Sequence, residues 1–309
     1  MENNEESGEV YHVPVLLEEV LEGLAIKPDG IYVDCTFGGG GHSKEILKRL
    51  NEKGRLIAFD QDADAQRNIP DDPRVLFLPH NFRHIHRFLR LHKIPPVDGL
   101  LADLGVSSHQ FDEAERGFSI RFDAPMDMRM DARQEKTAYD VLMRKSELGL
   151  HKMFERYGEV TNAKTLAKTI VEVRRTVSLK TIENFKQAVQ HIVKGNPNKY
   201  FAQVFQALRI EVNDELGVLK ELLQQLPEVL KEGGRAAIIT FHSLEDRLVK
   251  TYFKKGDFEE VEDVYDLYGD SGKSEHFKLV NKKPIVAGKE ELKRNPRSRS
   301  AKLRIAEKI

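Results

Sequence analysis

Hydrophobic and polar positions along the chain follow two periods in turn, one typical of strands and one typical of helices. Apolar, β-branched runs at residues 31–33 and 56–59 predict two short strands. Between them, residues 43–50 carry apolar side chains on one helical face, which predicts an amphipathic helix. Strands that alternate with helices pair in parallel through right-handed crossovers. We therefore expect an α/β fold with a parallel sheet.

The same alternation continues further along the chain. Apolar runs predict three more strands of this sheet, at residues 75–78, 97–104 and 235–241. Helical periodicity predicts helices at residues 13–24, 62–68, 82–91 and 201–231. Alternating polarity at residues 277–280 and 301–305 predicts an antiparallel hairpin that closes the sheet.

The strand pattern stops at about residue 110 and returns only after a long helical stretch. Residues 138–157, 162–175 and 181–193 have the spacing of amphipathic helices. We therefore expect a discontinuous sheet domain made of residues 1–109 and 205–309. A helical domain of residues 110–204 is expected as an insertion.

Four consecutive glycines, Gly38 to Gly41, lie where the first strand turns into the first crossover helix. Without side chains they can adopt positive φ angles and let a ligand approach the backbone. The helix start adds unpaired N–H groups and a positive dipole end. The second strand ends at Asp60, where a carboxylate can bind ribose hydroxyls. A plain turn is the alternative for an isolated glycine run, but the whole unit favours a nucleoside site.

The form of the loop separates two nucleoside ligands. A nicotinamide site prefers a third glycine three positions after the second, but Ser43 follows Gly40 at that distance. Asp34 ends the first strand beside the loop; its charge would repel a pyrophosphate and suit a ligand that carries an amino group. S-adenosylmethionine has an amino acid end, a sulfonium charge and no phosphate. The residues therefore favour a methyl donor over NAD.

Other candidate residues follow the ends of the later strands. Asp103 begins the segment DLGVSS after the fourth strand, at the edge where doubly wound sheets bind ligands. We expect it to face the reacting end of the ligand; capping a turn is the alternative. Phe82 could lie against an adenine ring or pack in the core. His242 could cap, pack or contact substrate, and Ser243 is expected to cap the following helix with Asp246 in the capping-box position.

Composition limits the partners. The chain has 309 residues and a net charge of −1, so attraction to nucleic acid requires a local basic patch. Residues 293–299, KRNPRSR, are the best phosphate-binding candidate, with a merely solvated loop as the alternative. Cys35 is the single cysteine, which excludes an internal disulfide, fits a reducing cytoplasm and is expected to be buried.

Targeting and metal signals are weak. No apolar run approaches the roughly 20 residues of a membrane span. The acidic residues 1–9 lack the pattern of a signal peptide and are expected to form a frayed tail. His80, His84 and His86 match no zinc spacing, so we expect solvated or RNA-facing histidines and no metal site. The methionines of residues 126–130 are expected to pack flexibly under a loop.

Several segments together resemble one family, the bacterial methyltransferases that modify the exocyclic N4 of a cytosine in 16S ribosomal RNA. They run in family order from about residue 11 to the C-terminus. The segments are HVPVL at 12–16, DCTFGGGGHS at 34–43, DLGVSS at 103–108, ERGFS at 115–119, PMDMRMD at 125–131, FQALRIEVN at 205–213, FHSLEDR at 241–247 and NPRSRS at 295–300.

The resemblance implies a class I S-adenosylmethionine-dependent methyltransferase sheet (Rossmann-like) whose inserted helical domain recognises RNA. It implies S-adenosylmethionine as methyl donor and, as acceptor, a decoding-region cytidine of 16S rRNA within the small ribosomal subunit. By their position after the fourth strand, Asp103 and the backbone carbonyls of Leu104 and Gly105 are the catalytic candidates that would accept the amino N–H groups. The resemblance assigns Asp103 to the donor, so these two roles compete. Carried over position by position, the donor contacts fall on Gly40, Gly41, His42, Asp60, Phe82, Asp103 and Gln110. The sequence departs from the family pattern at residues 160–162 and 200–204, both in the insert.

Three other functions remain as alternatives. A DNA amino-methyltransferase would share the sheet, but DLGVSS lacks the proline pair and aromatic residue expected at that strand end. A nicotinamide oxidoreductase is disfavoured by the loop and by Asp34. A ribosome-assembly factor that binds RNA without catalysis would need no intact donor site.

Overall fold

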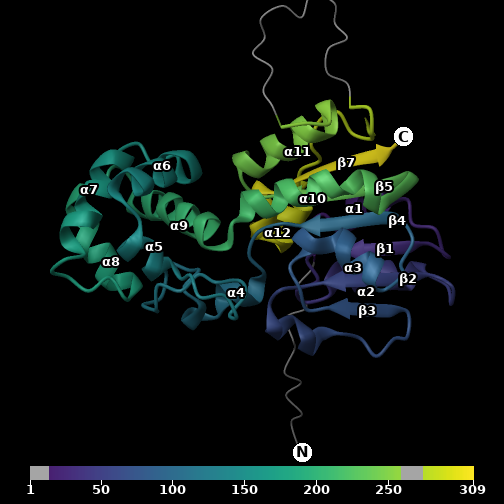
Figure 1. Ribbon diagram of the computed structural model, residues 1–309, viewed down its shortest axis with the longest axis horizontal. Coiled ribbons are helices and arrows are strands. Elements are labelled where there is room, and N and C mark those ends of the chain that lie inside the picture. Colours follow the sequence, from purple (N-terminus) through teal and green to yellow (C-terminus); the bar gives the residue numbers. More distant parts are fainter. Residues whose placement is uncertain (1–13, 259–273) are drawn as a thin grey trace, which may run out of the picture.

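The computed structural model describes residues 14–258 and 274–309, and a sheet of seven strands forms the framework of its larger unit (Figure 1). The strand order is β3-β2-β1-β4-β5-β7-β6. Strands β1 to β5 pair in parallel, whereas β7 runs antiparallel to both β5 and β6. The strands are β1 Ile31–Asp34, β2 Arg55–Phe59, β3 Val75–Leu78, β4 Val97–Asp103, β5 Leu230–Thr240, β6 Phe277–Leu279 and β7 Lys302–Lys308. The predicted strands and the Rossmann-like sheet are confirmed.

Helices cover both faces of the sheet because neighbouring strand residues point to opposite sides. On one face, Tyr32 and Leu101 pack under α1 Leu17–Leu24 and α2 Gly41–Arg49. On the other face, Val33 and Leu100 pack under three helices. These are α3 Ile85–Leu91, α10 Glu215–Val229 and α11 Ser243–Lys255. Burial on both faces explains why the parallel strands are continuously apolar.

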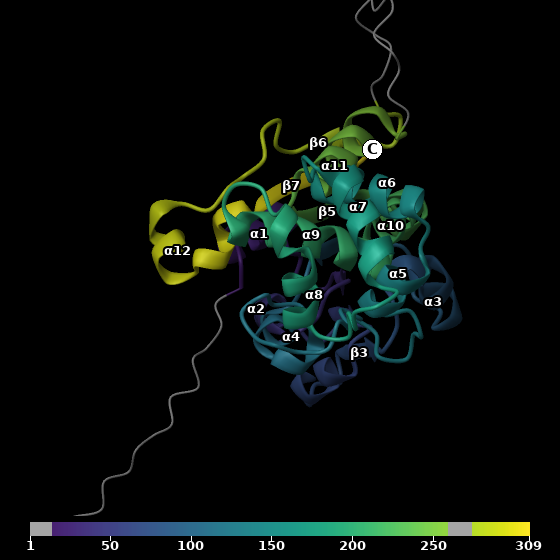
Figure 2. The same ribbon diagram turned by 90° about the vertical axis from the view of Figure 1, so that its left-hand side faces the viewer.

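A second hydrophobic core, separate from the sheet, contains buried residues from Phe118 to Val212. It is built by α5 Ala138–Arg144, α6 Glu147–Gly158, α7 Ala163–Val173, α8 Ile182–Val189 with the 3₁₀ turn Gln190–Ile192, and α9 Pro197–Asn213. Figures 1 and 2 show this helical unit beside the ends of the strands. A domain boundary at residue 204 falls inside α9.

Two predicted helices are each divided in the structure. Residues 138–157 form α5 and α6, because Ser146 accepts a hydrogen bond from the Gly149 N–H and starts a new helix. Residues 201–231 form parts of α9 and α10, which meet at Asp214 with φ +51°. The hydrophobic spacing continues through this break. However, α9 packs in the helical core and α10 on the sheet, so the chain must turn between them.

Smaller differences concern helix ends. The predicted helix at 62–68 is a 3₁₀ helix, Ala63–Asn68, and the one at 82–91 begins as the 3₁₀ turn Phe82–His84 before α3. The expected cap at Ser243 is wrong, because α11 begins one residue earlier than expected. His242 is its N-cap, and Glu245 takes the capping-box position that was expected for Asp246. His242 therefore has the capping role.

The segments near the C-terminus and after β4 complete the described chain. They are α4 Ser108–Asp112, the 3₁₀ turn Ala114–Arg116, α12 Lys289–Arg294 and the 3₁₀ turn Pro296–Ser300. Met126, Met128 and Met130 are buried in the helical core, which confirms their packing role. The expected frayed tail at residues 1–9 lies outside the described residues, and so does the segment 259–272, whose acidic composition is typical of a loop. In the parts of the chain that the structure describes, no helix combines the length and apolar character that crossing a membrane requires.

Candidate functional site

A cavity of about 1140 Å³ lies beyond the carboxyl ends of the parallel strands. Its wall includes six of the seven predicted donor-binding residues: Gly41, His42, Asp60, Phe82, Asp103 and Gln110. Gly40 lies just behind the wall, where it precedes α2 as the N-cap. Residues far apart in the sequence are therefore brought together at the predicted edge of the sheet.

The glycine loop places backbone rather than side chains beside this cavity. The Gly38 N–H donates to Asp60 Oδ2 at 2.7 Å, so the loop is fixed to the end of β2. The Gly40 N–H donates to the Phe37 carbonyl at 2.7 Å, and Gly40 has φ +73°. A Cβ on Gly39 would meet no atom within 4 Å, so this position borders open space. The loop therefore leaves room for a ligand against the helix start.

We expect Gly40→Ala to lower the free energy of unfolding by about 1–2 kcal/mol, because Gly40 holds a left-handed backbone conformation. An added Cβ would also lie 2.9 Å from Phe37 Cζ. Gly39→Ala is the matched control, since its Cβ has space, and should stay near wild type in stability. Urea unfolding of both variants measures the difference. Equal stability of the two variants would show that the loop conformation is not restrictive.

Asp34, at the end of β1, does not line the cavity. Its carboxylate is buried behind the cavity wall, where Oδ2 accepts from Ser43 Oγ at 2.7 Å and Oδ1 accepts from the Thr36 N–H at 3.0 Å. Burial raises the pKa of Asp34, although these hydrogen bonds oppose the shift. Asp34 thus holds the glycine loop against α2, and the cavity wall takes its acidic character from other residues.

Asp103 is the carboxylate at the end of β4 that faces the cavity. Its backbone N–H donates to Thr36 Oγ1 at 2.7 Å, which fixes the end of the strand. Its Oδ1 atom is buried and has no hydrogen-bond partner among the described residues. Burial, with the nearby charges of Asp34 and Glu245, raises the pKa of Asp103 to about 8. An unsatisfied carboxyl oxygen at a cavity wall suits a ligand with cationic or N–H groups.

His42 lies next to Asp103, with Nδ1 3.9 Å from Asp103 Oδ2. Its Nε2 is 2.9 Å from the Val15 carbonyl oxygen, which can only accept, so Nε2 carries the hydrogen. Burial lowers the pKa of His42, which keeps the ring neutral. The Nδ1 lone pair therefore faces the Asp103 carboxyl group and does not supply a positive charge to it.

The raised pKa of Asp103 predicts a pH dependence of stability. Between the unfolded pKa near 4 and the folded pKa of about 8, folding takes up a proton at Asp103, so this residue destabilises the fold as pH rises. We expect the melting temperature of the donor-free protein to fall relative to that of Asp103→Asn from pH 5 to 8. The difference should level off above pH 8. A constant difference across this range would show that Asp103 is ionised throughout.

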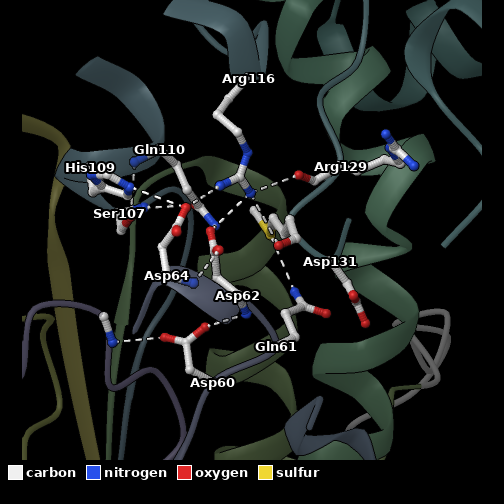
Figure 3. A network of polar contacts seen from close by, with 12 residues as sticks. Asp60, Gln61, Asp62, Asp64, Ser107, His109, Gln110, Arg116, Arg129 and Asp131 are labelled. Atoms are coloured by element: carbon white, nitrogen blue, oxygen red, sulfur yellow. Dashed lines mark hydrogen bonds and ion pairs between the residues drawn. The ribbon is translucent and has the colours of Figure 1, made fainter. Parts of the chain in front are cut away.

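A polar network joins the end of β2 to α4 and to the helical unit (Figure 3). Asp60 Oδ1 accepts from the Asp62 N–H at 2.8 Å, and Asp62 Oδ2 accepts from Gln110 Nε2 at 2.7 Å. Burial raises the pKa of Asp60 to about 6, against the hydrogen bonds from the Asp62 and Gly38 N–H groups. Gln110 also accepts from the Ser107 N–H at 3.1 Å, within a capping box. The network therefore fixes Asp60 and Gln110 in the wall.

Arg116 is the centre of this network, and sequence reasoning missed it. Its guanidinium lies 2.9 Å from Asp62 Oδ2 and 3.4 Å from Asp64 Oδ2 (Figure 3). It also donates to the Arg129 and Met130 carbonyls at 3.1 and 3.3 Å. Burial alone would raise the pKa of Asp62, but the hydrogen bonds from Arg116 and Gln110 hold it below its usual value. The segment ERGFS, residues 115–119, was recognised as part of the family pattern, but no role was predicted for its arginine.

The histidines that the sequence analysis considered for a metal, and the single cysteine, make contacts at separate positions in the fold. His86 Nδ1 is 3.1 Å from Glu228, and His80 stacks on Phe88 with ring centroids 4.3 Å apart. Cys35 is buried as expected, and burial raises its pKa well above the usual value.

Among the described residues, one group has side chains close enough to hold a metal ion: Glu215, His242 and Glu245. Arg209 donates to both oxygens of Glu215 at 2.8 and 2.9 Å. Glu245 accepts from the Phe241 N–H at 2.9 Å as part of the cap of α11. The protein thus supplies cationic and N–H partners for both carboxylates, and the group connects α9, α10 and α11.

This strand order, with a glycine loop at the first crossover and carboxylates beyond β2 and β4, defines the class of Rossmann-like methyltransferases. The chain matches the model of the MraW methylase family over residues 9–309, and it belongs to that family. It is therefore a methyltransferase, and S-adenosylmethionine is its methyl donor.

Relatives share nearly the whole chain. A protein of Parabacteroides distasonis named ribosomal RNA small subunit methyltransferase H is 53% identical over 307 residues, 99% of this chain and 100% of its own length. Proteins of the same name from Cytophaga hutchinsonii and Flavobacterium johnsoniae are each 55% identical over 97% of this chain. The matches cover 100% and 98% of those two proteins.

Proposed function

We propose that this protein transfers a methyl group from S-adenosylmethionine to the exocyclic N4 of a cytidine in the decoding region of 16S rRNA. The substrate is the RNA within the small ribosomal subunit, and the reaction takes place in the cytoplasm. The buried, unpartnered Asp103 oxygen beside the cavity is the observation that carries the chemistry. The shared name of the relatives, which specifies small-subunit ribosomal RNA, supports the substrate.

The cavity residues fit the methyl donor. The glycine loop offers backbone beside open space at Gly39, where a side chain would narrow the site. Asp60 uses each carboxylate oxygen once, for the Gly38 and Asp62 N–H groups, and keeps further lone pairs for ribose hydroxyls. Phe82 lines the wall as an apolar surface for a base. Gly40, Gly41, His42, Asp60, Phe82, Asp103 and Gln110 would hold the donor, which supplies an electrophilic methyl group on a cationic sulfur.

Asp103 is proposed as the catalytic residue that contacts the acceptor. The lone pair of the cytosine amino nitrogen is delocalised into the ring, which makes this nitrogen a weak nucleophile. A carboxylate that accepts an N–H hydrogen bond localises the lone pair and positions the nitrogen. The backbone carbonyls of Leu104 and Gly105 directly follow Asp103 and are proposed to accept the second N–H; of these two residues, Gly105 lines the cavity. The ionised form of Asp103 is favoured when cationic groups lie in the cavity.

The helical unit is proposed to recognise RNA. It lies at the carboxyl ends of the parallel strands (Figure 1), and its residue Met130 lines the cavity. The target cytidine must leave its stack to reach Asp103, so the surrounding RNA must be held while one base is turned into the cavity. Helices at this edge can supply that hold without entering the donor site.

The test is transfer of labelled methyl from S-adenosylmethionine to small ribosomal subunits that lack the modification, followed by nucleoside analysis. Label in N4-methylcytidine is the expected result. Label in another nucleoside, or transfer to DNA instead, would contradict the proposed substrate. Donor binding without transfer to any RNA would favour an assembly role.

A further inference from the structure

A cluster of one aromatic and two basic side chains lies at the rim of the cavity, and the donor site does not use it. Phe111 of α4 is flanked by two guanidinium groups, Arg121 Cζ at 5.8 Å and Arg297 Cζ at 5.4 Å from the ring centroid. These residues, the Arg–Phe–Arg cluster, come from α4, the helical unit and the C-terminal 3₁₀ turn. Three segments that are distant in the sequence thus place two cations against one aromatic ring.

Arg297 connects this cluster to the cavity, because it is itself a wall residue. It also donates to Asp112 Oδ1 at 2.6 Å, and both side chains are partly exposed, at 38% and 59%. A guanidinium above a ring keeps its N–H groups at its edge, where they can bind a phosphate. The Asp112 carboxylate therefore lies where a phosphate oxygen of a bound strand could take its place.

An exposed aromatic residue lies next to the cluster in the sequence. Phe122 directly follows Arg121 and is 47% exposed, whereas most large apolar side chains of the helical unit are buried. Exposed aromatic rings beside arginines are typical of proteins that bind single-stranded RNA, where bases stack on the ring and phosphates pair with the cations. With a net charge of −1, the chain depends on such a local arrangement to bind RNA.

We propose that the Arg–Phe–Arg cluster binds phosphates of the RNA strand next to the target cytidine, and that Phe122 stacks a neighbouring base. This inference rests on the proposed function. Arg121 and Arg297 hold the RNA backbone at the rim of the cavity. The target cytosine, next to the held phosphates, is then turned into the cavity toward Asp103. In the protein without RNA, Asp112 accepts a hydrogen bond from Arg297, so it competes with an RNA phosphate for this guanidinium.

The test measures binding of unmodified small subunits, their KM in methyl transfer, and donor affinity. For Arg121→Gln and Arg297→Gln we expect weaker binding and a KM raised about 10-fold at ~0.15 M salt. The slope of log binding constant against log salt concentration should become shallower by about 0.7 for each phosphate that the variant no longer neutralises.

Phe122→Ala should raise KM about 5-fold or more because a base no longer stacks, with little change in this salt slope. Asp112→Asn should bind subunits more tightly, a gain that a purely structural role would not produce.

Arg90→Gln is the matched control, because Arg90 is an exposed arginine on α3 and its loss changes the charge equally. The inference is overturned if Arg121→Gln and Asp112→Asn behave like this control, or if Arg121→Gln weakens donor binding and leaves subunit binding intact. Subunit binding decides this separately from catalysis. If wild type binds subunits without methylating them, the proposed function fails, and the binding of the variants still decides the role of the cluster.

Discussion

Asp103→Ala should lose turnover by about 10³-fold, the largest loss of activity expected from a single substitution in the cavity. The carboxylate lies at the end of β4 with one buried oxygen that no described residue satisfies. Its removal deletes the acceptor for the amino N–H and a negative charge beside the cationic donor. Single-turnover methyl transfer and donor titration measure the two effects separately.

Asp103→Asn distinguishes the two roles of this residue. Its amide oxygen can still accept a hydrogen bond, but the charge is lost. We expect turnover nearly as low as in Asp103→Ala, with weaker donor binding than wild type. Asp29→Ala is the surface control. Asp29 is exposed and precedes β1, so it lies at the edge of the sheet opposite to the cavity. Full turnover and full donor affinity in Asp103→Ala would rule out both roles.

Arg116→Met should cause the largest loss of stability, about 3 kcal/mol in the free energy of unfolding, because it breaks a mostly buried ion pair. Arg116 and Asp62 have side chains only 19% and 10% exposed. The change also leaves the Arg129 and Met130 carbonyls without their guanidinium donor. Turnover should fall on the order of 100-fold, since misplacement of wall residues by about 1 Å has effects of that size.

Arg67→Met is the matched control for this variant. Arg67 lies 3.3 Å from the same Asp64 but is 79% exposed, so its loss should change stability by no more than about 0.5 kcal/mol. Denaturant unfolding and donor titration are the measurements. If Arg116→Met matches Arg67→Met in both, the network of Figure 3 does not organise the site.

Sequence reasoning succeeded where one local pattern decides the structure. The strands are apolar because both faces are covered, and the glycine loop and Asp103 follow directly from strand ends. It failed where distant contacts decide. The break at Asp214 depends on α9 and α10 packing in different cores. The inward turn of Asp34 depends on Ser43, and the role of Arg116 depends on carbonyls and carboxylates from two other segments.

The pairing of β4 with β5 also has a consequence for how the chain folds during synthesis. These neighbouring strands are separated by more than a hundred residues, yet they form the middle of the sheet. Contacts between residues so far apart form late, because closing a long loop costs entropy before the contact is made. The helical unit has a core of its own, made by segments close in sequence. Once it is formed, the hydrogen bonds of Asn213 with Met128 and Met130 hold the start of α10 near the segment that follows β4. This shortens the effective loop, so the insertion that separates the two halves of the sheet also helps to join them.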